Sequence, residues 1–316
     1  MEDGTNGNTT RSSNQSSDVK VVFILGYTRS GSTLLEQLLS MAPGTIAVGE
    51  MTYLWAERVR NESYCGCSSK WMDCPFWKSI LKVLPSRDFA EDRSPDAPQF
   101  WGFFRDLVRK GHASDNQHYQ RFLDQIESVY LAIHDQTGCR VIIDSSKEPF
   151  FGLAVSNTKL DVTFVHLVRD SRGCAFSWKK AKARMELGKH EFMPQFPAYW
   201  SALAWVANNL QAEILRRRRC QSSILRYEDL VDNPTLEVNK ILNQLGLPPI
   251  SRDQNGIFHA PTSHGIWGNP SRWSSMDGIK VIKDERWVTE LSKVDFTLST
   301  LISAPLLKWY GYPLLR

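Results

Sequence analysis

The stretch GYTRSGST, which begins at Gly26, follows the apolar run VKVVFIL and has most features of a phosphate-binding loop. Gly26 and Gly31 have the spacing of the motif G-x-x-x-x-G-K-[ST], and Thr33 occupies its last position. Ser32 stands where that motif has lysine, and the only cation in the loop is Arg29. A glycine-rich turn ahead of a helix lets backbone N–H groups converge on an anion. We therefore expect an anion to be bound by Thr28, Arg29, Ser30, Gly31, Ser32 and Thr33.

The missing lysine indicates which anionic group the loop binds. A kinase or ATPase uses the loop lysine and a metal ion, because the terminal phosphoryl group is highly charged. A sulfuryl group carries one less negative charge, and fixed N–H donors and an arginine can stabilise it without Mg²⁺. The loop thus favours sulfuryl transfer. It leaves open a small-molecule kinase that uses ATP and Mg²⁺.

The elements around the loop have the pattern of an α/β protein. The run 19–25 predicts a strand buried on both faces. After the loop, Leu34, Leu35, Leu38 and Leu39 form an apolar stripe at helical spacing. The loop therefore lies between a strand and the N-terminus of a helix, where a phosphate-binding loop is expected.

Three further strands are expected at 139–146, 160–171 and 222–230, and helical patterns follow at 171–187, 197–217 and 234–245. Strands that alternate with helices favour a P-loop-like, doubly wound parallel sheet flanked by helices. Residues 52–136 look mostly helical, and we expect them to form an inserted cap. Ligands of such sheets bind at the carboxyl ends of the strands. Polar residues lie at those ends, at Arg29, Asp144–Lys147, Arg169–Ser171 and Tyr227–Asp229.

Composition limits the class of protein. The chain has 316 residues and a formal net charge of +4, which suits an anionic small ligand and gives little reason to expect nucleic acid. Residues 1–18 contain no large apolar side chain after Met1, so we expect a disordered tail before a single domain at 19–316. No signal peptide or membrane-spanning run is evident. These features predict a cytoplasmic protein whose six cysteines are free thiols.

Four segments together resemble the sulfotransferases that use 3′-phosphoadenosine-5′-phosphosulfate (PAPS). GYTRSGSTLLEQLLS is similar to their 5′-phosphosulfate loop, and VHLVRDSRGCAFSW resembles their 3′-phosphate motif, here with Arg169 and Ser177. RYEDLVDNP is similar to their Y-E-D-L segment and GNPSRW to a cofactor-contacting loop, which implies roles for Tyr227 and Arg272. The segments keep the family order and span most of the chain.

The resemblance implies PAPS as co-substrate, 3′-phosphoadenosine 5′-phosphate (PAP) as product, and an acceptor hydroxyl. The acceptor would be a small molecule, such as a metabolite, carbohydrate, lipid or phenol, and the cap would lie on its side of the site. Arg29 replaces the lysine of cytosolic animal enzymes, and a cysteine-containing segment lies near 65–74. Both departures make the chain more similar to bacterial-type or tyrosyl-protein-type sulfotransferases.

Sulfuryl transfer calls for a general base at the acceptor and a cation at the leaving group. Glu50, in IAVGEMTYLW, resembles the catalytic glutamate of tyrosyl-protein sulfotransferases and is the expected base. His264 and His259 flank the GNPSRW loop and are the alternatives. Arg29 and Lys147 are the candidate cations at the leaving group, although Lys147 could instead be exposed and paired with Asp144.

Two features leave other possibilities open. Cys65, Cys67 and Cys74 are three nearby thiols, but their spacing is not a familiar zinc motif and no histidine is close in sequence. We therefore expect no metal site. An inactive nucleotide-binding module would carry the same loop, although Glu50 argues against that alternative. Neither the acceptor nor the oligomeric state follows from the sequence.

Overall fold

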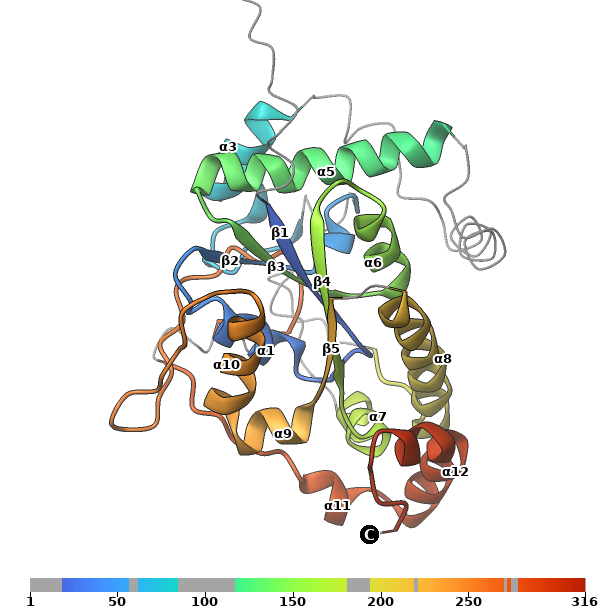
Figure 1. Cartoon of the computed structure of the whole chain (residues 1–316). Helices are drawn as coiled ribbons and strands as arrows, with labels where there is room; N and C mark the ends of the chain where they lie inside the picture. The colour runs from blue at the N-terminus through green and yellow to red at the C-terminus, as the bar shows by residue number, and fades with distance from the viewer. Residues whose placement is uncertain are drawn as a thin grey trace, which may run out of the picture.

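The computed structural model describes residues 19–56, 62–84, 117–180, 194–218, 221–269, 272–273 and 278–315. The expected tail at 1–18 lies outside these ranges, as do residues 57–61 and 85–116 of the expected cap. In the described part, five parallel strands form one sheet in the order β2-β3-β1-β4-β5 (Figure 1). In chain order the strands are β1 (Lys20–Leu25), β2 (Thr45–Gly49), β3 (Val141–Lys147), β4 (Asp161–Val168) and β5 (Ser222–Arg226).

The central strand β1 is apolar on both sides because helices cover both faces of the sheet. Val21, Phe23 and Leu25 belong to one buried cluster, and Val22 and Ile24 belong to another. The first cluster contains side chains of α5 (Gln117–Thr137), α6 (Pro149–Ser156) and α8 (Ala198–Arg217). The second contains side chains of α1 (Ser32–Leu39), α9 (Tyr227–Asp232) and α10 (Pro234–Gln244).

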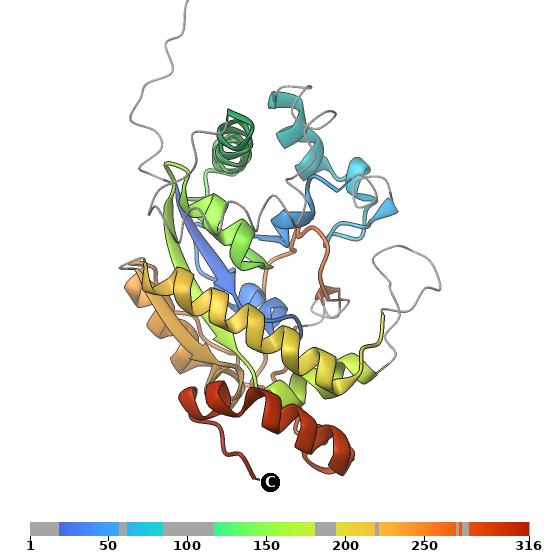
Figure 2. The same ribbon diagram turned by 90° about the vertical axis from the view of Figure 1, so that its right-hand side faces the viewer.

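The remaining helices extend these layers. The helix α12 (Lys293–Trp309) packs against α7 (Ser171–Lys179) and α8 on one side of the molecule (Figure 2). The described part of the expected cap contains η2 (Met51–Tyr53), η3 (Trp71–Asp73) and α3 (Pro75–Val83), and α3 packs against α5. A short helix, α11 (Arg286–Glu290), lies before α12.

The sequence-based expectation of a doubly wound parallel sheet is confirmed, with two local differences. The short strand β2 was not expected, and it forms one edge of the sheet beside β3. The predicted strand at 222–230 ends at Arg226, after which Tyr227 begins the helix α9. None of the described helices is both long enough and apolar enough to span a bilayer.

Candidate active site

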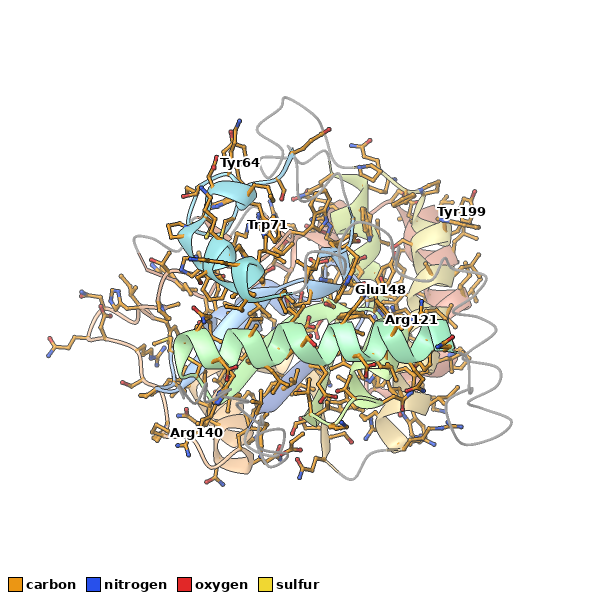
Figure 3. All side chains as sticks on the ribbon, turned by 90° about the horizontal axis from the view of Figure 1, so that it is seen from above. Tyr64, Trp71, Arg121, Arg140, Glu148 and Tyr199 are labelled. Carbon is orange, nitrogen blue, oxygen red and sulfur yellow. The ribbon has the colours of Figure 1, made fainter. Side chains whose placement is uncertain are left out.

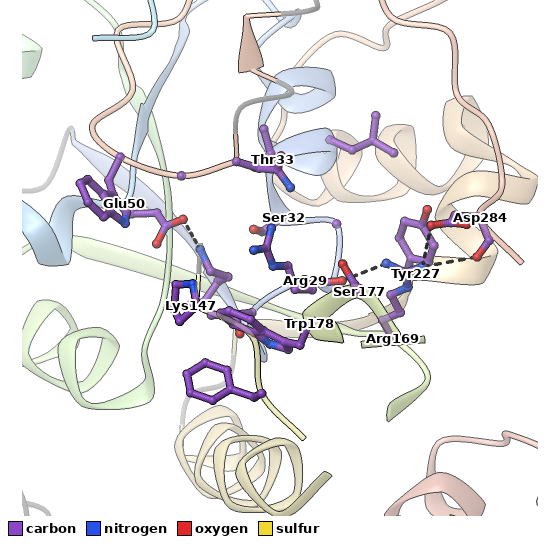
Figure 4. A pocket seen from close by; sticks show the side chains of 18 of the residues that line it. Arg29, Ser32, Thr33, Glu50, Lys147, Arg169, Ser177, Trp178, Tyr227 and Asp284 are labelled. Carbon is purple, nitrogen blue, oxygen red and sulfur yellow. Dashed lines mark hydrogen bonds and ion pairs between the residues drawn. The ribbon is translucent and has the colours of Figure 1, made fainter. Parts of the chain in front are cut away.

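A cavity of about 490 Å³ lies at the carboxyl ends of the strands, within the size range of small-molecule sites (Figure 4). Parallel strands bring their ends to one edge of the sheet, so loops far apart in sequence meet there. Most of the predicted site residues line this cavity: Thr28, Arg29, Gly31, Ser32, Thr33, Glu50, Lys147, Arg169, Ser177 and Tyr227.

The glycine-rich loop connects β1 to the N-terminus of α1. Gly31 precedes the helix with a φ of 94°, and no side chain caps the first turn. The first N–H groups of α1 have no intrahelical acceptor and lie where an anion can accept hydrogen bonds from them. A Cβ atom at Gly31 would come within 2.5 Å of the Tyr227 ring, so glycine is needed for close packing as well as for its backbone conformation.

Three non-glycine residues of the cavity wall have left-handed backbone conformations. Arg29 has a φ of 69°, Lys147 of 68° and Trp267 of 54°. In the described part of the chain, one other non-glycine residue has a positive φ. It is Ser68, which does not line the cavity. A left-handed conformation costs free energy for residues of these types, and it recurs where a side chain must be held at a functional site. The backbone conformations and the types of side chain therefore both indicate a functional site at this cavity.

Arg29 lies in the middle of the cavity, on the face of an indole ring. Its guanidinium carbon is 4.7 Å from the centre of the Trp178 ring. Trp178 follows Ser177 on α7, so one helix supplies both a hydroxyl and an aromatic surface to the wall. The stacking holds the cation of the loop in place through a cation–π contact.

Arg169, at the end of β4, forms a second cationic position. Its guanidinium lies 4.4 Å from the centre of the Tyr227 ring and donates to the carbonyl oxygen of Arg29 at 3.1 Å. Nη2 also lies 3.8 Å from a carboxylate oxygen of Asp284. Figure 4 shows Arg169, Tyr227, Asp284 and Ser177 together on one side of the cavity. The side chain is fixed and mostly buried, as a binding site for a charged group requires.

The opposite side of the cavity carries an ion pair. Lys147 Nζ lies 2.7 Å from Glu50 Oε1, and both side chains are largely buried. Glu50 follows β2, and its backbone N–H donates to the Ile266 carbonyl oxygen at 2.8 Å. Lys147 ends the neighbouring strand β3 and donates to the carbonyl oxygen of Ser145 at 2.9 Å. Figure 4 shows the pair on the side opposite Arg169.

Lys147 is therefore neither exposed nor paired with Asp144, the alternative that the sequence had left open. Asp144 accepts hydrogen bonds from Tyr130 and from both the backbone and the hydroxyl of Ser146. Burial raises the pKa of Asp144 to about 6. Burial also raises the pKa of Glu148, which lies next to Lys147 in sequence.

A further buried carboxyl group, that of Glu36 on α1, lies beneath the cavity. It accepts a hydrogen bond from the Gly49 backbone N–H at 2.9 Å and another from the Ser145 hydroxyl. Burial raises the pKa of Glu36 to about 7, against the opposing effects of the Ser145 hydrogen bond and the Lys147 charge. Glu36 thereby links α1 to the ends of β2 and β3, from which Glu50 and Lys147 extend.

Comparison with known proteins gives the family. The family model described as the sulfotransferase family matches residues 21–251. The chain belongs to the sulfotransferase family. It is 27% identical over 307 residues to nodulation protein NoeE of Sinorhizobium fredii. This match covers 92% of the chain and 66% of NoeE, just under two thirds of that protein's length.

Solved sulfotransferase structures share the fold. The sulfotransferase domain of the Synechococcus PCC 7002 olefin synthase is 17% identical, with a TM-score of 0.50, and the match covers 95% of this chain and 98% of that domain. The sulfotransferase domain from the curacin biosynthetic pathway is 18% identical, also with a TM-score of 0.50, over 93% of this chain and 99% of that domain. These two structures show the fold, and the match to the family model confirms the family resemblance of the sequence.

Three of the residues predicted for the sulfotransferase site lie outside the cavity wall. Ser30 belongs to the loop but is buried and does not line the cavity. The Arg272 guanidinium donates to the carbonyl oxygens of Tyr64 and Trp267 and supports the wall from behind. His264 faces the cysteine segment, with its Nδ1 atom 3.4 Å from Cys74 Sγ. Their proposed roles at the cofactor or in proton transfer stay predictions.

Several wall residues were not singled out from the sequence. Tyr53 and Gly268 lie in the sequence segments in which Glu50 and Arg272 were recognised. Trp178 is adjacent to Ser177. Their proximity to recognised motif residues could have indicated all three. Asp284 has no such signal, because it reaches the cavity from a segment outside every motif.

Proposed function

We propose that this sulfotransferase transfers a sulfuryl group from PAPS to a hydroxyl of a small-molecule acceptor by in-line displacement. The observation that carries the proposal is the arrangement of cations along one cavity. Arg29 and the uncapped start of α1 lie between Arg169 on one side and the Lys147–Glu50 pair on the other (Figure 4). PAPS has two anionic ends, and this arrangement offers a separate site for each.

The 3′-phosphate would bind Arg169 and Ser177. A guanidinium matches the geometry of a phosphate and forms charge-assisted hydrogen bonds with it. Ser177 supplies a hydroxyl from the same side of the cavity. Tyr227, stacked on the guanidinium, would keep it oriented. This second anion site distinguishes PAPS from ATP, which lacks a 3′-phosphate.

The 5′-phosphosulfate would bind the loop, Arg29 and the N-terminus of α1. The acceptor oxygen would form a bond to sulfur while the bond from sulfur to the bridging phosphate oxygen breaks, releasing PAP. Glu50 would take the acceptor proton. Lys147 and Arg29 would stabilise the negative charge that develops on the bridging oxygen. The pairing of Lys147 with Glu50 supports this division of roles, because it holds a carboxylate and an ammonium group 2.7 Å apart in the cavity wall.

The acceptor would enter beside Glu50, where two aromatic side chains form part of the wall. The ring centres of Tyr53 and Trp267 lie 5.3 Å apart, and Gly268 borders the same region. Aromatic faces suit the apolar surface of a phenol, a sugar ring or a lipid, and all these acceptor classes remain in the proposal.

The two alternatives have less support. In a kinase, Mg²⁺ and the loop lysine neutralise the terminal phosphate, whereas here Ser32 replaces that lysine and Arg29 and Lys147 supply the positive charge. An inactive module would have no need of a buried Glu50–Lys147 pair in the cavity. The cytoplasmic location, the absence of a nucleic-acid partner and catalysis without a metal stay predictions.

Thermal unfolding with nucleotides tests the donor. PAP should raise the midpoint temperature of unfolding in buffer that contains neither Mg²⁺ nor a chelator. A ligand that binds only the native state stabilises it by about 2.7 kcal/mol when its concentration is 100 times its Kd. Adenosine 5′-phosphate, which lacks the 3′-phosphate, should stabilise the protein less. Stabilisation by ATP with Mg²⁺ but not by PAP would favour the kinase. An inactive module would bind PAP yet transfer no labelled sulfuryl group from PAPS to any acceptor in a screen.

A further inference from the structure

Three cysteines and one histidine converge at a second place, outside the cavity wall. Cys65, Cys67 and Cys74 come from the segment 62–84, and His264 comes from a loop far along the chain. Their potential ligand atoms, the three Sγ atoms and one imidazole nitrogen, all lie within 4.8 Å of one another. None of these cysteines forms a disulfide in the structure. The sequence had offered no nearby histidine, and folding supplies one.

Three of the six distances among these four atoms are close to those of a tetrahedral metal site. Cys67 Sγ lies 3.6 Å from Cys74 Sγ, and His264 Nδ1 lies 3.7 Å from Cys65 Sγ and 3.4 Å from Cys74 Sγ. In a tetrahedral zinc site with ordinary bond lengths, neighbouring ligand atoms are about 3.5–3.8 Å apart. Three thiolates and an imidazole are also a common ligand set of structural zinc. We propose that Cys65, Cys67, Cys74 and His264 bind one Zn²⁺ ion.

The local backbone holds the cysteines in this arrangement independently of a metal. The Cys65 N–H donates to the Ser69 carbonyl oxygen at 2.8 Å, and the Ser68 N–H donates back to the Cys65 carbonyl oxygen at 2.9 Å. Ser68 has a φ of 69°, which allows the tight turn between Cys67 and the returning chain. Cys74 immediately precedes α3, and its carbonyl oxygen accepts a hydrogen bond from the Lys78 N–H at 2.9 Å, which fixes the backbone at this position.

The histidine is held just as firmly. Its ring stacks on Phe76 with centres 4.6 Å apart and planes 8° from parallel. Its carbonyl oxygen accepts a hydrogen bond from Trp77 Nε1 at 2.8 Å. Next to it, the Gly66 N–H donates to the Gly265 carbonyl oxygen at 3.2 Å, and a Cβ atom at Gly66 would come within 2.5 Å of the Ser263 carbonyl oxygen. The two segments therefore dock closely, with Nδ1 facing two of the thiols.

The role of the metal would be structural. The protein supplies four ligands, which fills a tetrahedral site and leaves no position for substrate. The zinc would join segment 62–84, which carries Tyr64 and Trp71 beside α5 in Figure 3, to the loop that continues into Trp267 and Gly268. Those two residues line the cavity, so the metal would fix the wall beside Glu50. This replaces the sequence-based expectation that the three cysteines bind no metal.

Metal analysis of the full chain tests the site. Protein is purified with zinc in the medium and then dialysed against a weak chelator. Elemental mass spectrometry should find one Zn²⁺ per chain. Cys67→Ser changes a half-buried ligand. It should reduce zinc affinity at least about tenfold, because the loss of a residue that only supports a ligand already costs about that much. The control Cys139→Ser, which alters a cysteine outside the cluster, should keep the wild-type content.

A second variant keeps the test decisive if the loss of a ligand impairs folding. His264→Cys offers four thiolates and should still bind one ion, whereas His264→Ala should bind it more weakly. In the Co²⁺ form, wild type should give the visible bands of a tetrahedral site, with more intense thiolate charge-transfer absorption in His264→Cys. Wild-type protein without zinc, zinc content unaffected by both Cys67→Ser and His264→Ala, or a Cys67–Cys74 disulfide in the freshly purified chain would each overturn the proposal.

Discussion

Lys147 Nζ and Glu50 Oε1 lie 2.7 Å apart at the ends of two neighbouring strands, β3 and β2. The two side chains are 5% and 13% exposed, so each charge depends on the other for compensation. Lys147, the last residue of β3, has a left-handed backbone conformation, and it lines the cavity. The pair thus links the stability of the site to the charges that we propose act in sulfuryl transfer.

A double-mutant cycle should reveal this link. Lys147→Met leaves the Glu50 carboxylate without its cation, and Glu50→Gln leaves the Lys147 ammonium without its anion. We expect the free energies of unfolding of the two single variants and the double variant to give a favourable interaction of about 1–3 kcal/mol. The exposed pair Lys78–Asp73, whose side chains are 59% and 65% exposed, is the control and should give less than about 0.5 kcal/mol. Additive effects at Lys147 and Glu50 would show that the pair is not coupled.

Glu50→Gln also tests the general base. Once an acceptor is known, kcat should fall by about 10²–10⁴-fold, the usual contribution of a general base, while PAP affinity stays nearly unchanged. The loss should be smaller for an acidic phenol than for an aliphatic alcohol, because an acidic hydroxyl needs less help to lose its proton.

The matched control is Glu285→Gln, which removes an exposed carboxylate outside the cavity and should leave turnover unchanged. Near-normal turnover of Glu50→Gln would exclude Glu50 as the base. The search would then move to His264 and His259, although neither lines the cavity: His264 faces the cysteines, and His259 is exposed beside Asp253.

The sequence predicted the parts of the site that are local in the chain. The apolar run of β1, the glycine loop and the start of α1 are contiguous, so their strand, turn and helix patterns could be recognised together. The end of β5 was misjudged because the apolar pattern continues through Leu230, although Tyr227 already starts a helix. The strand β2 was missed because TIAVG is short and includes glycine, which is uncommon in strands.

Contacts between distant segments could not be predicted in this way. Glu50 and Lys147 were each recognised as candidates, but their pairing depends on β2 lying beside β3, a strand order that periodicity does not specify. The same applies to His264 and the cysteines, which come together because the loop before Trp267 docks on segment 62–84. Sequence patterns indicated which residues could act, and the topology of the sheet determined which of them meet.

Arg169→Ala should separate the two proposed anion sites. Binding of PAP should weaken by about 1.5–3 kcal/mol, the scale of a hydrogen bond to a charged group. Adenosine-5′-phosphosulfate lacks the 3′-phosphate, and its binding should weaken much less. Calorimetry with both ligands makes the measurement.

The structure adds a reason for a control, since Arg169 also supports the loop by donating to the Arg29 carbonyl oxygen. Arg169→Lys keeps the charge but not the planar fork, and we expect its loss of PAP affinity to be intermediate. Equal losses for PAP and adenosine-5′-phosphosulfate in Arg169→Ala would mean that the residue acts through the loop or the fold.

The buried carboxyl group of Glu36 should make stability depend on pH. Its pKa is about 7 in the folded protein, against an ordinary value of 4.5. Between pH 4.5 and about 7, Glu36 keeps its proton in the folded state and loses it in the unfolded chain. The free energy of unfolding therefore falls as the pH rises, and this loss is complete above about pH 7. Glu36→Gln mimics the protonated form and removes this effect. The free energy of unfolding of wild type, relative to Glu36→Gln, should therefore fall by roughly 3 kcal/mol as the pH rises from 4.5 to 8.

Denaturant titrations of both proteins at several pH values measure this difference. Asp144 and Lys147, the other charged groups that act on Glu36, are present in both proteins, so their own titration largely cancels. The amide introduced by Glu36→Gln can keep the hydrogen bond from the Gly49 N–H, and the Ser145 hydroxyl can turn to accept from it. A difference that stays constant across this pH range would show that Glu36 titrates alike in the folded and unfolded states. An increase with pH would mean that the folded protein favours the charged carboxylate, stabilised by Lys147.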